Sequence, residues 1–242
     1  MFRPSRLLVA SCRLPTRSLG KVRFLASSES YPSRRHLSTL SSTSVCPRCS
    51  APLPTPLPVC PKCAYIAQIP PTMSHHDILG AAYDPNPFVV DQSELKDRFR
   101  NLQSIIHPDR WAGKSEELQA AAAVMSARVN NALHHLTSPL RRVEYILEQE
   151  GFGHREADSF DDKELLMEVM EVHEDIANAQ SQAVIENIKE RNSVKLGETI
   201  RDIEALVGAK DWPAVQAAAI KLKYLTGIDA AAASWPSHVH DH

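Results

Sequence analysis

Two closely spaced pairs of cysteines are the residues of this sequence whose type and spacing most directly suggest chemistry. Each pair has the form Cys-x-x-Cys, and ten residues rich in proline separate the two pairs. Four thiolates form the tetrahedral donor set of structural zinc, and the neighbouring Arg48 and Lys62 offset their negative charge. The pattern therefore predicts structural zinc held by four ligands, which are Cys46, Cys49, Cys60 and Cys63.

Two features of this cysteine segment leave alternatives open. The gap between the pairs is shorter than the usual gap of about 15 to 20 residues, which predicts a small ribbon or hairpin. Ser50 and Ala64 stand where a glycine often follows each pair, so the geometry of the turns stays open. Redox-active dithiols are an alternative, but thioredoxin-like chemistry requires a βαβ context that a proline-rich segment does not supply. An iron-sulfur cluster on the same four sulfurs also stays open.

A second candidate is the tripeptide formed by His107, Pro108 and Asp109. Proline fixes φ and prevents a helix from continuing, so the histidine and the aspartate are held rigidly on either side of it. An aspartate placed in this way can pair with a cation of a partner protein in a desolvated contact. The alternative is that Asp109 only caps the next segment and that His107 is an ordinary surface residue.

The tripeptide lies between two stretches with helical periodicity. Asp91 and Glu94 have the spacing of a capping box, so the first helix begins near residue 92, and it ends before Pro108. Its apolar positions are Leu95, Phe99, Leu102 and Ile106. The opposite side of this helix is basic and carries Lys96, Arg98 and Arg100. A second helix is predicted from about residue 115 to residue 136.

A third candidate is an apolar patch on a later helix. Leu166, Met167 and Met170 stand at positions i, i+1 and i+4, so they share one helix face, and Glu171 and Glu174 line its edge. Methionine adapts to irregular partner surfaces, which favours a binding site. The alternative is that these three apolar residues belong to the core of the bundle. A different stripe of the same helix fits the core better: Leu165, Val169, Val172 and Ile176. Tyr224 is a weaker candidate, because a lone helical tyrosine is often packing.

These motifs together resemble a known family. The His-Pro-Asp loop in a helical hairpin with a basic face resembles the J-domain. Three further segments resemble HscB-type co-chaperones, namely residues 138–147 followed by Gly151 and Phe152, residues 165–171, and residues 222–225. The resemblance covers about residues 74 to 230, nearly all of the mature chain outside the cysteine segment.

The resemblance carries expectations about partners. It implies that His107, Pro108 and Asp109, with the basic face, dock on a DnaK-type chaperone and stimulate its ATPase. It also implies that the C-terminal helices bind an iron-sulfur cluster scaffold protein and promote cluster transfer. The residues expected to do so are Leu166, Met167, Met170, Glu171, Glu174 and Tyr224.

The predicted fold class is all-α, with a J-domain helical hairpin and a C-terminal three-helix bundle, preceded by a small four-cysteine zinc module. The helices of the bundle are expected at about residues 162–179, 182–207 and 212–225. The predicted domains are a transit peptide at 1–41, the zinc module at 42–70, the J-domain at 74–152, the scaffold-binding bundle at 160–230 and a disordered tail at 231–242. We expect the helical domains to have separate cores, so that loss of zinc unfolds residues 46–63 only.

Charge and composition narrow the function further. Residues 1–41 hold eight Lys or Arg and one Glu, a net charge of +7. Since the whole chain has a net charge of −2, the remaining residues carry −9. The basic, acid-poor start predicts import into the mitochondrial matrix. The acidic remainder argues against nucleic-acid binding, and charges interrupt every apolar run before it reaches the roughly 18 to 20 residues of a membrane span.

No catalytic set is visible, so the chain is not expected to be an enzyme. Two alternatives remain. One is a general mitochondrial J-domain co-chaperone for unfolded clients, although the usual Gly/Phe-rich linker is missing. The other is a zinc-dependent or thiol-dependent enzyme built on the cysteine pairs.

Overall fold

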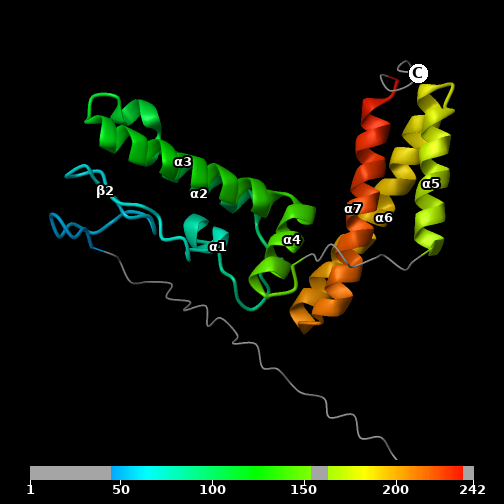
Figure 1. Ribbon diagram of the computed structural model, residues 1–242, viewed down its shortest axis with the longest axis horizontal. Helices are drawn as coiled ribbons and strands as arrows, with labels where there is room; N and C mark the ends of the chain where they lie inside the picture. The colour runs from blue at the N-terminus through cyan, green and yellow to red at the C-terminus, as the bar shows by residue number, and fades with distance from the viewer. Residues whose placement is uncertain (1–44, 154–162, 237–242) are drawn as a thin grey trace, which may run out of the picture. The chain divides into compact units, whose positions relative to one another are not determined.

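The computed structural model describes residues 45–153 and 163–236, and these residues are mostly helical (Figure 1). Within these ranges there are seven α-helices, one 3-10 helix and one two-stranded sheet. The predicted all-α class is therefore confirmed. The predicted transit peptide at 1–41 and the last six residues lie outside the described residues. No described helix is long and apolar enough to cross a membrane.

The cysteine segment forms the small hairpin that the short gap predicts. Strand β1, Val59–Cys60, pairs antiparallel with β2, Tyr65–Ile66, and Val59 lies opposite Ile66. An isolated bridge between Val45 and Pro52 closes the first half of the segment. Two residues per strand are too few to support a sheet alone, so the segment depends on other contacts.

The hairpin that carries the His-Pro-Asp tripeptide consists of α2, Gln92–Ile106, and α3, Glu116–Thr137, which lie side by side (Figure 1). The Asp91 side chain accepts hydrogen bonds from the amides of Ser93 and Glu94, so it caps α2 as the sequence predicts. Leu95, Leu102 and Ile106 of α2 are buried, together with a stripe of α3. Between the helices, residues Pro108–Trp111 form the 3-10 helix η1.

Two short helices complete this part of the chain. Helix α1, His75–Leu79, has a capping box between Ser74 and Asp77, and it ends at Gly80, whose φ of 66° is the left-handed conformation that glycine adopts freely. Helix α4, Pro139–Gln149, begins with proline in its first turn. Its Arg142 is buried, and the guanidinium donates to the carbonyls of Leu136 (2.8 Å) and Phe88 (2.6 Å).

Three helices form the C-terminal part: α5, Lys163–Ala177; α6, Gln182–Ala209; and α7, Trp212–Ser234. Two ends differ from the prediction. Helix α6 ends at Lys210, which takes the left-handed conformation (φ 58°), rather than at Gly208. Helix α7 continues through Gly227, so residues 231–234, which were assigned to the disordered tail, are helical.

Burial and composition explain the longer α7. Ile228 and Ala232, one turn apart, are buried in the cluster that α7 forms with α5 and α6. A run of four alanines from residue 230 has the highest helix propensity, which offsets the cost of one glycine inside the helix. Gly227 was therefore a poor signal for the end of α7, because tertiary packing decides where this helix ends.

The expectation of separate cores was wrong. Leu57, Val59 and Ile69 of the cysteine segment are buried in the same hydrophobic cluster as Ile78 and Ile106 of the J-domain region. The cluster extends into α6 and α7 through Ile203, Val207 and Val215. A segment with two short strands cannot bury these side chains by itself, so it uses the surface of the neighbouring helices.

Candidate functional site

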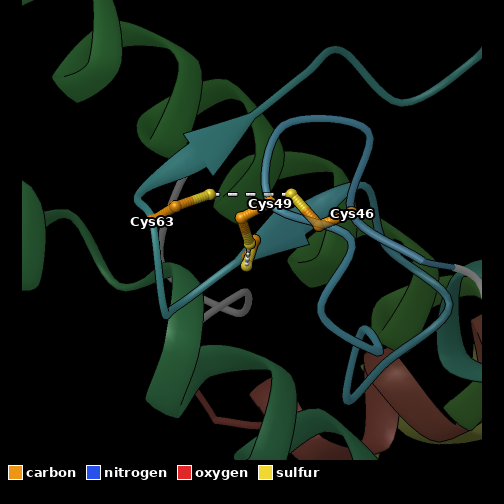
Figure 2. A group of neighbouring side chains, drawn as sticks. Cys46, Cys49 and Cys63 are labelled. Atoms are coloured by element: carbon orange, nitrogen blue, oxygen red, sulfur yellow. Dashed lines mark hydrogen bonds between the residues drawn. The ribbon is translucent and has the colours of Figure 1, made fainter.

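The four cysteines of the hairpin bring their sulfurs together at one point. All four Sγ atoms lie within 4.8 Å of one another. The Sγ–Sγ distance is 3.6 Å between Cys46 and Cys63 (Figure 2) and 3.7 Å between Cys49 and Cys60. Zinc bonded to sulfur at about 2.3 Å in a tetrahedron separates its sulfurs by about 3.8 Å. The four free thiols are therefore close enough to hold one tetrahedral metal ion.

The turn that follows each cysteine pair has a left-handed backbone conformation at Ser50 and at Ala64. Both residues have positive φ, 55° at Ser50 and 54° at Ala64. This left-handed conformation costs a residue with a Cβ about 1 kcal/mol or more relative to glycine. The turn after each cysteine pair thus has the backbone conformation of a glycine although glycine is absent. Within the first pair, the amide of Arg48 donates to the Cys46 sulfur at 3.4 Å.

The thiols of the second pair have different environments. The Cys63 amide, donating to the Cys60 sulfur, lowers the pKa of the Cys60 thiol to about 7. Burial, with the neighbouring sulfurs, raises the pKa of the Cys63 thiol to about 12. A divalent cation between the sulfurs would favour the thiolate form of all four, which is how metal binding couples to proton release.

The His-Pro-Asp tripeptide is exposed at the end of the α2–α3 hairpin. The side chain of His107 is 54% exposed and that of Asp109 is 89% exposed. The amide of Asp109 donates to Nδ1 of His107 at 3.3 Å, and Pro108 begins η1. Both polar side chains are therefore available to a partner, while local hydrogen bonds hold the backbone between them.

The basic side chains of α2 differ from one another. Lys96 and Arg100, four residues apart, are exposed on one face, and Arg100 pairs with Asp97. Arg98 is half-buried instead, because its guanidinium pairs with Glu94 (2.6 Å) and reaches the Leu79 carbonyl at 3.4 Å. The structure thus brings Lys96 and Arg100 together and turns Arg98 toward α1.

The apolar patch predicted on α5 is exposed. Leu166 is 41% exposed, Met167 71% and Met170 57%, whereas Leu165, Val169 and Ile176 are buried against α6 and α7. The helix-face argument therefore separates the two sets correctly, although Val172 is only half-buried. Glu171 and Glu174 are exposed at the edge of the patch, and Tyr224 of α7 is half-buried against the same cluster.

Three functional or supporting side chains were missed by the sequence interpretation. Arg110 and Trp111, directly after the tripeptide, donate to carbonyls at the end of α2, and Lys195 of α6 forms an ion pair with Glu168 beside the apolar patch. The missing proline N–H at residue 108 could have signalled Arg110, because it leaves the Ser104 carbonyl without its usual donor.

The chain is similar to known proteins over most of the described helices. The family described as the HSCB C-terminal oligomerisation domain matches residues 161–233. The chain is 26% identical over 171 residues to the human iron-sulfur cluster co-chaperone protein HscB, covering 70% of this chain and 72% of that protein. It is 30% identical to a co-chaperone protein HscB homolog of Vibrio vulnificus, covering 63% of this chain and 91% of the relative.

Two further similarities extend the comparison. A mitochondrial J-type co-chaperone of Saccharomyces cerevisiae is 30% identical over 160 residues, covering 61% of this chain and 79% of the relative. The crystal structure of human co-chaperone protein HscB superposes with a TM-score of 0.67 and 25% identity, covering 78% of this chain and 97% of that one. The sequence matches, the matched domain and the shared fold show that this chain belongs to the HscB family of iron-sulfur cluster co-chaperones.

Proposed function

We propose that this protein binds an iron-sulfur cluster scaffold protein through α5 and delivers it to a DnaK-type chaperone, whose ATPase it stimulates through the His-Pro-Asp loop. The observation that carries the proposal is the exposure of two separate surfaces, the tripeptide at residues 107–109 and the apolar patch on α5. One chain with two such surfaces can hold two proteins at once, which is how cluster transfer is promoted without catalysis by the chain itself.

The proposed chaperone contact combines a basic edge of α2 with the exposed carboxylate of Asp109. Lys96 and Arg100 give α2 a basic edge that steers an acidic partner surface, and this attraction weakens with salt. The Asp109 carboxylate, 89% exposed, can pair with a cation of the chaperone. Losing one member of such a desolvated pair costs about 2 to 5 kcal/mol, so this carboxylate is the residue on which the contact depends most.

The scaffold contact is a small apolar centre with an acidic edge. Met167 and Met170 expose flexible, polarizable side chains that adapt to a partner surface, and Leu166 extends the same patch. Glu171 and Glu174 at the rim favour a partner with basic residues around an apolar centre. Half-buried Tyr224 of α7 packs against the cluster that contains the buried residues of α5, and it is the weakest member of the proposed contact.

The cysteine hairpin holds structural zinc in this proposal. A tetrahedral zinc ion on four thiolates contributes folding free energy to a segment that has two strands of two residues each. Its role is to fix the fold of the segment, and we assign it no step in cluster transfer.

The proposed location is the mitochondrial matrix. The basic, acid-poor composition of residues 1–41 supports import, and so does the similarity to a yeast co-chaperone named as mitochondrial. The proposed domains are the zinc module at 42–70, the J-domain at 74–152 and the scaffold-binding bundle from 160, whose last helix continues to Ser234.

The scaffold contact can be tested with a triple variant, Leu166→Ala, Met167→Ala and Met170→Ala. Single truncations in a hot spot often cost about 1 to 2 kcal/mol or more, so we expect scaffold binding to weaken at least about a hundredfold in titration calorimetry. Thermal stability should fall little, because these side chains are exposed, whereas truncating a core Leu or Met costs about 2 to 5 kcal/mol each.

A matched control comes from a second exposed apolar residue. Val194 of α6 is 57% exposed, and Val194→Ala should leave scaffold binding unchanged. Normal binding by the triple variant would remove α5 from the scaffold site. Recovery of many unrelated clients rather than a scaffold, in a pull-down from mitochondrial extract, would favour the general J-protein alternative.

A further inference from the structure

The end of α2 poses a hydrogen-bonding problem that the tripeptide itself creates. In an α-helix the carbonyl of residue i accepts from the amide of residue i+4. The amide that would serve Ser104 belongs to Pro108, which has no N–H, so the helix series stops at the bond from His107 to Gln103 (2.9 Å). The amide that would serve Ile105 belongs to Asp109, and it donates to Nδ1 of His107.

Two side chains directly after the tripeptide supply the missing donors. The Arg110 guanidinium donates to the Ser104 carbonyl. The indole N–H of Trp111 donates to the Ile105 carbonyl at 3.1 Å. Trp111 is also buried in the main hydrophobic cluster, whereas Arg110 is exposed. The indole is therefore the more firmly held of the two donors, since its ring is fixed by packing on both α2 and α3.

The Nδ1 atom of His107 accepts a hydrogen bond from the backbone just after the end of α2. The helical conformation ends at His107, whose ψ is 130°, so the Asp109 amide donates to His107 Nδ1, and the indole of Trp111 serves the Ile105 carbonyl in its place. A neutral imidazole that accepts at Nδ1 carries its proton on Nε2. The side chain of His107 thus presents a defined donor, and the Asp109 backbone is fixed next to its exposed carboxylate.

We propose that Trp111 is a positioning residue for the His-Pro-Asp loop, acting through its indole N–H on the Ile105 carbonyl to fix the His107 tautomer and the Asp109 backbone. Arg110 acts in the same sense at the Ser104 carbonyl. The proposal rests on the proposed function, in that a fixed loop is what the chaperone would bind with less loss of conformational freedom. It goes further by assigning the rigidity of the loop to a buried side chain.

Trp111→Phe tests the proposal in the full chain, because phenylalanine keeps a buried aromatic ring and removes only the N–H donor. Two readouts need no partner: the 15N spectrum of the His107 ring and the exchange rate of the Asp109 amide. We expect a mixture of tautomers and an exchange rate about fivefold to tenfold higher, given the net contribution of one hydrogen bond. Maximal stimulation of the chaperone ATPase should fall several-fold at unchanged helicity.

Controls separate the loop from general effects. Trp212→Phe removes an indole N–H from a tryptophan of α7 and should change none of the readouts. Arg110→Ala, at an exposed position, should shift the Asp109 exchange rate in the same direction even if Trp111→Phe folds poorly.

The outcomes are distinguishable. An unchanged His107 tautomer and an unchanged Asp109 exchange rate in both loop variants would overturn the proposal, and so would full stimulation by a Trp111→Phe variant whose loop has loosened. If the wild-type chain itself gives no stimulation, the proposed function fails. The tautomer and the exchange rate then still decide whether Trp111 fixes the loop.

Discussion

At the scale of single residues, the cysteine hairpin keeps a glycine-type backbone without glycine. Ser50 and Ala64 both adopt positive φ directly after a cysteine pair. The spacing of the cysteines predicts the ligand set and the hairpin, because four sulfurs around one ion leave few arrangements of the chain. The residues after each pair could not be predicted to take this conformation, because only the geometry of the whole hairpin imposes it.

Ala64→Gly should therefore stabilise the protein. Glycine adopts positive φ without a Cβ clash, so we expect the free energy of unfolding to rise by up to about 1 kcal/mol in denaturant titration of the metal-loaded chain. Ala67→Gly is the matched control: Ala67 does not have positive φ, and glycine there should destabilise by increasing the entropy of the unfolded chain. A loss of stability in Ala64→Gly would contradict the strain argument.

At the scale of elements, helical periodicity and capping residues predict α2, α3 and the exposed face of α5, because these signals are local. The contacts between elements are not local, and the sequence interpretation misses them. Arg98 is predicted to bind the chaperone with Lys96 and Arg100, and nothing in the sequence indicates that its guanidinium also reaches the Leu79 carbonyl at the end of α1. Helix α7 passes through Gly227 because its last turns pack on α5.

The basic residues of α2 should separate in a charge experiment. Lys96→Glu with Arg100→Glu should weaken chaperone binding, and the loss should shrink at high salt, because both side chains are exposed. Arg98→Ala should instead lower thermal stability, with a smaller and salt-independent effect on binding. Binding measured by fluorescence anisotropy at two salt concentrations checks this, and equal, equally salt-dependent losses in the double variant and in Arg98→Ala would contradict the separation.

The packing of α1 against α3 and α4 predicts a pH dependence. The ring of His75 stacks with that of His135 (centroids 4.7 Å apart) and lies 4.4 Å from that of Tyr145. Burial, with smaller effects from His135, His76 and Arg128, lowers the pKa of His75 to about 4. The unfolded chain therefore binds a proton that the folded chain does not, and the stability from this site is lost as pH falls from about 6.5 to 4.

His75→Gln should flatten that part of the stability curve. The free energy of unfolding at several pH values between about 4 and 7 checks this, with His134→Gln as the control, since His134 lies on the same helix as His135. A slope that is the same in wild type and in His75→Gln would rule out His75 as its source.

At the scale of the whole molecule, the cysteine segment and helices α1 to α4 are one packing unit. Leu57, Val59 and Ile69 are buried against the helices, and Arg128 of α3 donates to the carbonyls of Ile69 (2.5 Å) and Pro70 (3.2 Å). The sequence suggested an independent module because its cysteines suffice to hold a metal. The apolar residues between and after them could not be assigned a packing partner from periodicity.

Removal of the metal should therefore affect more than residues 46–63. We expect chelation to increase hydrogen exchange in α3 near Arg128 as well as in the hairpin, because metal binding supplies folding free energy to both. Exchange in α5 serves as the internal control, since its buried residues belong to a different cluster. Elemental analysis should find about one zinc per chain. Increased exchange confined to the hairpin would show that metal loss does not destabilise α3, as expected if the hairpin and the helices had separate cores.

The chaperone ATPase, measured with and without scaffold, tests both contacts of the proposed bridge between scaffold and chaperone in one assay. Wild type should stimulate the ATPase, and scaffold should increase the stimulation further. Asp109→Asn should abolish both effects, because it removes the charge that pairs with the chaperone. The α5 triple variant should keep the basal stimulation and lose the part that depends on scaffold. Full stimulation by Asp109→Asn, or scaffold-dependent stimulation that survives the triple variant, would contradict the account.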